Sequence, residues 1–521
     1  MVDTKKEQER DELHRAIWAI ADELRGAVDG WDFKNYVLGT MFYRYISENL
    51  CNYINSGEID AGNTEFDFAK MPDEDAEEAK EGLVEEKGFF ILPSELFCNV
   101  RDNAANDENL NETLERVFRH IEESAKGSEA ERDFAGLFDD YDVNSNKLGS
   151  TVAKRNEKLV KLLNGVGEMN LGDVKDHSID AFGDAYEYLM TMYASNAGKS
   201  GGEFFTPADV SELLTRLGTV GKTEINKVYD PACGSGSLLL KAEKILGKDA
   251  IRNGFYGQEI NITTYNLCRI NMFLHDVGFD KFDIACEDTL LSPQHWDDEP
   301  FELIVSNPPY SIKWAGDENP LLINDPRFAP AGVLAPKSKA DMAFIMHSLS
   351  WLASNGTAAI VCFPGIMYRG GAEQKIRKYL VDNNYVDCII QLPSNLFFGT
   401  SIATCIMVMK KNKADNKTLF IDATSECVKV TNNNKLTPEN IERIVDVFAK
   451  REETEHFSHL ASYEEVSEND YNLSVSNYVE AEDTREKIDI VKLNAEIKEI
   501  VAREQVLRDE IDKIIAEIEV G

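Results

Sequence analysis

The 521-residue chain has no paired-cysteine motif and no long apolar run. Its nine cysteines are scattered without a Cys-x-x-Cys pair, which argues against a disulfide framework and against a zinc site. No run approaches the roughly 18 apolar residues that a membrane span needs, and the charged first ten residues do not resemble a secretory signal. We therefore expect a cytoplasmic protein that binds no metal and crosses no membrane.

Basic residues are also scarce, because 55 Lys and Arg stand against 93 Asp and Glu, for a net charge of −38. If this charge were spread evenly it would repel a nucleic-acid backbone. The distribution is uneven, however. Residues 57–87 hold twelve acidic and three basic side chains, most simply as a solvated loop or surface helix, whereas residues 311–380 hold eight basic and five acidic ones. One segment of this acidic protein is therefore net basic.

The length of the chain predicts two or three domains, at about 150 residues each. Leu13, Ile17, Ile20 and Leu24 recur at the three- and four-residue steps of an amphipathic helix. We expect an all-helical N-terminal domain over residues 1–165. A second domain is expected over 166–415, followed by a C-terminal region over 416–521 that ends in a helical tail.

From residue 225 onward, short β-branched runs alternate with helical patterns. This alternation predicts an α/β fold, a Rossmann-like, doubly wound and mostly parallel sheet whose two faces are covered by helices. Ligands of such sheets bind beyond the carboxyl ends of the strands, so the residues after each run are the candidates for chemistry. The runs are 225–230, 255–259, 282–286, 301–306, 357–363, 385–392 and 403–409.

A glycine turn follows the first run, from Asp230 through Gly234, Ser235 and Gly236. Two glycines let the backbone pass close beneath a ligand, and the following helix start offers free amides to it. A dinucleotide-binding fingerprint would need a third glycine where Leu239 stands, which counts against NAD.

One acidic residue ends the second run and another follows the third. Glu259 lies 23 residues after Gly236, the usual distance for an acid that accepts both ribose hydroxyls of a nucleoside-containing cofactor. Asp288 is placed either to meet the adenine of such a cofactor or to cap a helix. Together with the turn, these acids predict a cofactor that contains a nucleoside.

The tetrapeptide Asn307-Pro308-Pro309-Tyr310 follows the fourth run. Its prolines stiffen the loop and remove amide donors, which leaves the Asn307 side-chain oxygen and the Pro308 carbonyl as convergent acceptors. Two acceptors can hold the hydrogens of an amino group and turn its lone pair toward a methyl donor. Tyr310 offers a flat face for a heterocycle, a contact worth about 1 to 3 kcal/mol per base.

With these motifs the sequence resembles amino-group DNA methyltransferases, and more closely the modification subunit of type I restriction-modification systems. The resemblance implies transfer of a methyl group from S-adenosylmethionine to N6 of adenine. It also implies that residues 203–207 lie over the methionine end of the cofactor. One departure is Cys233, where alanine is common. The likeness is carried by Trp31-Asp32-Phe33, by residues 182–189, by Gly202-Glu203-Phe204-Phe205-Thr206-Pro207, by the glycine turn and by the tetrapeptide.

The resemblance further implies partners: DNA, one specificity subunit for two copies of this chain, and a restriction subunit that can join. A partner that reads the sequence would explain how a protein of charge −38 reaches DNA. The tail carries a coiled-coil pattern that needs either such a partner or packing on its own chain. This seam comprises Ile490, Leu493, Ile497, Ile500, Glu504, Leu507, Ile511, Ile514 and Ile518, broken only by Glu504.

The predicted mechanism flips the target adenine out of the duplex, stacks it on Tyr310 and holds N6 through Asn307 and Pro308. Phe397 is the candidate for the far face of the base, or else a core phenylalanine. Methylation at cytosine C5 is excluded, since it typically needs a nucleophile within a Pro-Cys pair and the chain has none. The alternatives are methylation of cytosine N4, methylation of a protein glutamine, and a non-catalytic docking scaffold.

Overall fold

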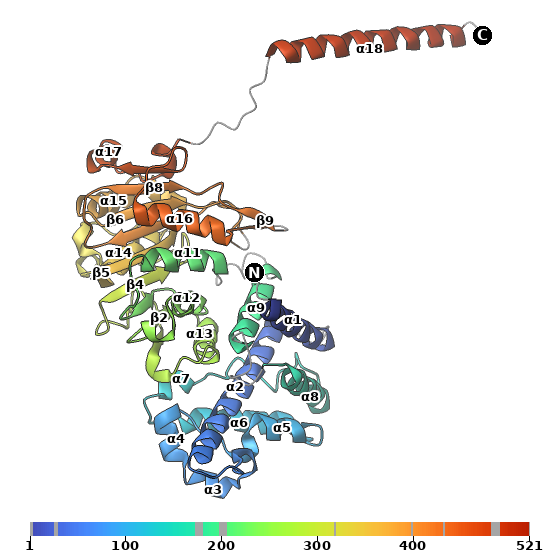
Figure 1. The fold of residues 1–521 in the computed structure, drawn as a ribbon, viewed down its shortest axis with the longest axis vertical. Coiled ribbons are helices and arrows are strands. Elements are labelled where there is room, and N and C mark those ends of the chain that lie inside the picture. The colour runs from blue at the N-terminus through green and yellow to red at the C-terminus, as the bar shows by residue number, and fades with distance from the viewer. Residues whose placement is uncertain are drawn as a thin grey trace. The chain divides into compact units, whose positions relative to one another are not determined.

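The computed structural model describes residues 4–24, 30–171, 181–196, 206–316, 319–397, 400–430, 433–480 and 490–519 (Figure 1). The chain forms two units, Met1–Val479 and Glu480–Gly521, which are described separately. In the described part of the chain, no helix is both long and apolar enough to span a membrane.

Helices account for all the regular structure described up to residue 171, as the sequence predicts. Leu13, Ile17 and Ile20 are at most 4% exposed, which confirms the amphipathic pattern of the first helix. The acidic stretch 57–87 contains the end of α2 and two short helices, α3 and α4. The bounds are α1 Thr4–Leu24, α2 Gly30–Asp60, α3 Asp73–Glu77, α4 Lys80–Lys87, α5 Phe97–Ala104, α6 Leu110–Ser124, α7 Glu131–Phe134 and α8 Val152–Glu168.

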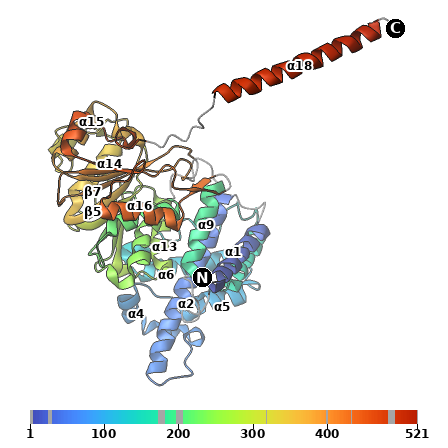
Figure 2. The ribbon, with the colours of Figure 1, turned by 45° about the horizontal axis from the view of Figure 1, so that its top comes forward.

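The second half of this unit is built on a nine-stranded mixed sheet with the order β11-β8-β6-β7-β5-β4-β1-β2-β3. Figure 2 labels two paired neighbours of this sheet, β5 and β7. Strands β3, β2, β1, β4 and β5 are mutually parallel, and β7 runs antiparallel between β5 and β6. The bounds are β1 Val228–Asp230, β2 Phe255–Glu259, β3 Phe282–Cys286, β4 Phe301–Ser306, β5 Leu352–Cys362, β6 Val386–Gln391, β7 Cys405–Lys410, β8 Thr418–Asp422 and β11 Ser458–Ala461.

All seven strands expected from the sequence are present, but β8 and β11 were not expected. The strand β11 lies at the sheet edge, pairs only with β8 and carries the polar residues Ser458 and His459, so it lacks an apolar run. The expected domain division at residue 415 therefore falls between two strands of one sheet. A separate hairpin joins β9 (Val428–Val430) to β10 (Asn433–Lys435).

Helices cover both faces of the sheet, which explains why its strands read as continuous apolar runs. Along β4, Leu303 and Val305 belong to one buried cluster, while Phe301 and Ile304 belong to another on the opposite face. The first cluster continues into the N-terminal helices, so those helices and one sheet face share a core. The helices of this region are α9 Ala181–Asn196, α11 Ala208–Thr219, α12 Ser237–Leu246, α13 Ile262–Leu274, α14 Asp341–Trp351, α15 Ala372–Asp382, α16 Pro438–Lys450 and α17 Tyr463–Glu468.

The second unit contains α18, Ile490–Glu519, which confirms the expected helical tail. The eight apolar residues of the expected seam are between 44% and 73% exposed. A helix of thirty residues with such an apolar stripe is typical of one strand of a coiled coil.

The packing of α11 on the sheet generates a stability prediction. A Cβ atom at Gly218 would lie 2.2 Å from Cδ1 of the fully buried Leu303, whereas one at Gly57, also helical, would meet nothing within 4 Å. Overpacking costs about 1 to 3 kcal/mol, while replacing a helical glycine by alanine gains up to about 1 kcal/mol. Gly218→Ala should therefore lower the thermal unfolding midpoint, and Gly57→Ala should keep or raise it. Equal midpoints for both variants would contradict this account of the helix contact.

Candidate active site

A cavity of about 350 Å³ lies at the carboxyl ends of β1, β2, β3 and β4. Its walls come from the loops that follow these strands, at residues 230–238, 258–260, 288–290 and 307–314, with Thr206 and Phe344 added. Because these strands are parallel neighbours, their loops gather at one edge of the sheet. The glycine turn, both acidic residues, and Asn307 and Pro309 of the tetrapeptide therefore open into one space, whereas Pro308 and Tyr310 do not line it.

The glycine turn adopts the backbone that only glycine tolerates well. Gly234 and Gly236 have φ angles of +54° and +78°. A Cβ atom at Gly236 would also lie 2.7 Å from the Cys268 Sγ, beneath the turn. Since α12 begins directly after Gly236, the free amides of its first turn lie beside the loop that lines the cavity.

Three carboxylates from successive strand ends line the cavity. Asp230 is 1% exposed, and its Oδ1 accepts hydrogen bonds from Ser306 Oγ at 2.7 Å and from the Ala232 amide at 2.9 Å. Burial raises the pKa of Asp230 to about 7 despite these bonds. Glu259 accepts from the Gly234 amide at 3.1 Å, and burial also raises the pKa of its carboxyl.

Asp288, the third carboxylate, precedes a turn and not a helix, so the expected alternative of a helix cap is wrong. Its Oδ1 accepts hydrogen bonds from the amides of Leu290 and Leu291 in that turn, at 2.9 and 3.2 Å. The same residue lines the cavity. The turn bonds fix its carboxylate at the cavity wall, where it can still meet a ligand.

The tetrapeptide is tied to the rest of the site through Asn307. The Asn307 Nδ2 donates to Thr206 Oγ1 at 3.1 Å, and the Tyr310 hydroxyl donates to Asn307 Oδ1 at 2.5 Å. Pro308 is buried, whereas Pro309 is exposed and lines the cavity. Tyr310 is partly buried against the core, and this burial raises its pKa well above the usual value.

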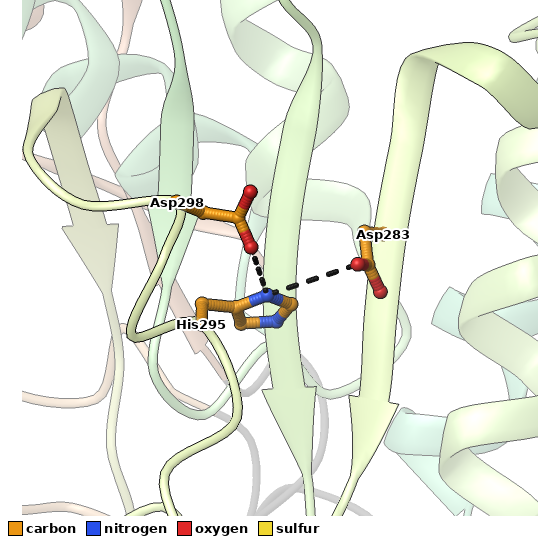
Figure 3. Close-up of side chains that lie close together, drawn as sticks. All are labelled: Asp283, His295 and Asp298. Carbon is orange, nitrogen blue, oxygen red and sulfur yellow. Dashed lines mark hydrogen bonds and ion pairs between the residues drawn. The ribbon is translucent and has the colours of Figure 1, made fainter.

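One group among the described residues has the composition and spacing to hold a metal ion, and it lies outside the cavity wall (Figure 3). His295 Nδ1 is 3.2 Å from Asp298 Oδ2 and 4.0 Å from Asp283 Oδ2. His295 Nε2 lies 2.9 Å from the Gly257 carbonyl, and Arg132 pairs with Asp283. These bonds connect β2, β3 and the following loop, which accounts for the cluster as a structural tie.

Comparison with known proteins decides the family. The sequence profile described as N-6 DNA Methylase matches residues 177–487, and the one described as HsdM N-terminal domain matches residues 13–166. The chain belongs to the N-6 DNA methylase family. It is a methylase subunit of the type I restriction-modification class, as the resemblance implied.

Individual relatives match this methylase over almost its whole length. The chain is 50% identical to the type I restriction enzyme MpnII methylase subunit of Mycoplasma pneumoniae, over 100% of this chain and 98% of that one. Its sequence is 35% identical to that of the type I restriction-modification methyltransferase subunit from Streptococcus thermophilus, whose crystal structure is known. That match has a TM-score of 0.81 and covers 90% of this methylase and 100% of the other chain.

The remaining expected site residues of the methylase lie in different surroundings. Glu203, Phe204 and Phe205 fall outside the described residues. Thr206 lines the cavity and contacts Asn307, a link that sequence reasoning missed, whereas Pro207 is buried at the start of α11 and does not line the cavity. Phe397 is 3% exposed within the core, which favours the alternative of a core phenylalanine.

Two aromatic walls of the cavity, Trp314 and Phe344, were not anticipated. Trp314 lies four residues after Tyr310, on the loop that the tetrapeptide begins. Its role could have been predicted from this position after the fourth strand. Phe344 lies on α14, whose residues are almost all buried, and its sequence pattern matches that of any core residue.

The raised pKa of Asp230 generates a prediction about stability and pH. The folded protein keeps a proton on this carboxyl up to about pH 7, whereas the unfolded chain releases it near the ordinary value of 3.8. The Asp230 contribution is therefore fully present below about pH 4 and is lost as pH rises toward 7, by up to about 1.4 kcal/mol per pH unit. Asp230→Asn removes this titration.

Denaturant unfolding of both proteins between pH 4 and 8 tests the point. The free energy of unfolding of the wild type, minus that of Asp230→Asn, should fall with rising pH. A difference that stays constant across this range would show that Asp230 is ionised throughout.

Proposed function

We propose that this methylase subunit transfers a methyl group from S-adenosylmethionine to N6 of an adenine extruded from DNA. The observation that carries the proposal is the shared cavity, since the glycine turn and the Asn307 tetrapeptide open into one space. Donor and acceptor of a methyl group must touch, and a common cavity meets that requirement. A volume of about 350 Å³ also lies within the range of small-molecule sites.

The residues present fit the cofactor. Carboxylates at Glu259 and Asp288 can accept hydrogen bonds from ribose hydroxyls and from an exocyclic amine, and flat apolar walls at Leu238, Ile260 and Phe344 suit a purine. When bound, S-adenosylmethionine supplies an activated methyl group. From the family resemblance we assign residues 203–206 to its methionine end, without Pro207, which does not line the cavity.

The target amino group is assigned to the Asn307 side-chain oxygen and the Pro308 carbonyl. The Asn307 Nδ2 donates to Thr206 Oγ1, and this bond directs the Asn307 Oδ1 away from Thr206 and toward Tyr310. Since the Tyr310 hydroxyl donates to that same oxygen, an incoming amino group must share or replace this bond. The ring of Tyr310 then provides the stacking face. Two acceptors bound to the amino hydrogens leave its lone pair free for transfer.

The direct test uses the full chain purified together with its candidate specificity subunit and DNA. Labelled methyl groups from S-adenosylmethionine should enter DNA, and nucleoside mass analysis should identify N6-methyladenine. N4-methylcytosine, or label in a glutamine of a protein, would replace the proposal by one of its alternatives. Absence of cofactor binding in calorimetry would support a non-catalytic scaffold.

Asn307→Ala should separate catalysis from cofactor binding. Loss of a preorganised polar group at a reacting centre typically costs about 100- to 1000-fold in rate, so methylation should fall by that factor. The affinity for S-adenosylmethionine should change little. Asn355→Ala is the matched control, because Asn355 bonds to Glu302 and lies outside the cavity wall. Methylation that survives Asn307→Ala would refute the acceptor role.

We also propose the assembly that the resemblance implies: DNA, two copies of this chain around one specificity subunit, and a restriction subunit that can join. The apolar seam of α18 supports a helical partner, because burying its isoleucines against another helix would remove apolar surface from water. A sequence-reading partner also suits a chain whose net charge of −38 opposes DNA binding.

The seam predicts the effect of a charge in α18. Ile497→Lys combined with Ile511→Lys should abolish co-purification with the specificity subunit, because a lysine in a helical seam cannot be buried without a large penalty. Cofactor affinity should be unchanged. Ala502→Lys adds a positive charge on the opposite side of the same helix and should leave the complex intact. Retention of the complex by the seam variant would place the partner elsewhere.

A further inference from the structure

A buried arginine stands directly behind the cavity wall. Arg327 comes from the segment between the tetrapeptide and α14, and it is 1% exposed. Its Nη1 donates to the Thr289 carbonyl at 2.8 Å, and its Nη2 donates to the Leu290 carbonyl at 2.7 Å. Both carbonyls belong to the loop 288–290 that lines the cavity after β3. One guanidinium therefore fixes two consecutive peptide groups of that wall.

The remaining donors of Arg327 are also satisfied. Asp325 accepts from Nε at 3.0 Å and from Nη2 at 2.8 Å, which compensates the buried positive charge. Nη1 also donates to His347 Nδ1 at 3.1 Å. An arginine with every N–H bonded inside the protein has one fixed orientation, so it can act as a rigid support.

The histidine extends this support to the first strand. A guanidinium can only donate, so His347 Nδ1 must be unprotonated and Nε2 carries the proton toward the Tyr229 hydroxyl, 2.9 Å away. Burial and the charge of Arg327 lower the pKa of His347 well below its usual value, which keeps this tautomer neutral. Tyr229 immediately precedes Asp230, so the chain of bonds reaches the start of the glycine turn.

A second bond closes the loop against that turn. Thr289 Oγ1 donates to the Pro231 carbonyl at 2.6 Å. The loop 288–290 is therefore held from one side by the glycine turn and from the other by Arg327. A lysine at position 327 could not replace the two hydrogen bonds from Arg327, because its single ammonium group lacks the planar fork that reaches two carbonyls at once.

We propose that Arg327 is a positioning residue that sets the adenine side of the cofactor cavity and joins it to the segment carrying the target-binding tetrapeptide. It touches neither ligand and acts through the loop 288–290. The inference rests on the proposed function, because it takes this cavity to be the cofactor site.

Arg327→Lys in the full chain is the test, with Arg377→Lys as its matched control. Arg377 is also 1% exposed and also donates to two main-chain carbonyls, of Ile366 and Tyr471, both at 2.8 Å. Neither carbonyl belongs to the cavity wall. Both variants lose the same kind of buried contact, so their unfolding midpoints should fall by similar amounts.

Of the two variants, only Arg327→Lys should weaken the binding of the cofactor. Displaced supporting residues typically cost about 10- to 100-fold in affinity or activity, so the Kd for S-adenosylmethionine measured by calorimetry should rise by that factor. The KM for the cofactor should rise in parallel, with a smaller change in kcat at saturation. Arg377→Lys should keep the wild-type Kd within about twofold, because a substitution that does not contact the cavity wall should hardly change the affinity for the cofactor.

Two results would overturn the inference: a wild-type Kd for Arg327→Lys, or equal increases in Kd for both variants. If Arg327→Lys fails to fold, Asp325→Asn decides, since it weakens the anchor of Arg327 and should raise the Kd by an intermediate factor, and an unchanged Kd there would also reject the role. Failure of the wild type itself to bind S-adenosylmethionine would instead reject the proposed function.

Discussion

The whole site depends on one buried hydrogen bond between neighbouring strands. Ser306, the last residue of β4, donates to Asp230, the last residue of β1, at 2.7 Å. One strand continues into the glycine turn and the other into the tetrapeptide. Both partners are fully buried, and Tyr229 pairs with Ile304, so the two strands end within one residue of each other and their loops leave the sheet side by side. The distance between the two halves of the site is thus fixed by the sheet.

The shared core extends this constraint to the N-terminal helices. A single buried cluster includes Ile17 of α1, Phe42 of α2 and Phe273 of α13, beside Leu303 of the sheet. Phe42 and Phe273 contact each other with ring centroids 5.8 Å apart. Interiors of this kind are packed as densely as crystals, so the helices cannot shift without disturbing α13 and the strands beside it. The N-terminal part of the chain is therefore mechanically coupled to the catalytic part.

The sequence was most informative where burial imposes a pattern. Strands covered on both faces read as apolar runs, and β2, β3 and β4 begin and end at the expected residues. Strand β11 was not predicted, because an edge strand can carry polar residues such as Ser458 and His459 and then has no apolar run. The site was predictable where chemistry restricts the residue type, as at Gly236 and Asn307. Phe344 and Arg327 were not, since their roles arise from contacts between segments far apart in the chain.

The same limit applies to Phe397 and Thr206. A core phenylalanine and a stacking phenylalanine have the same sequence signature, and only the 3% exposure of Phe397 separates them. Thr206 was expected to serve the cofactor, and its hydroxyl also accepts a hydrogen bond from Asn307 of the tetrapeptide. A hydroxyl can donate or accept in either surroundings, so residue type alone does not determine its partner.

Burial also changes what the net basic segment 311–380 offers to a polyanion. Two of its eight cations, Arg327 and Arg377, are enclosed in the protein. Three of its five carboxylates are likewise withdrawn: Asp325 is paired with Arg327, while Asp341 and Glu373 are at most 6% exposed. Proportionally more negative than positive charge is removed from the surface. The charge that the described residues of this segment expose to water is therefore more positive than the amino-acid composition suggests.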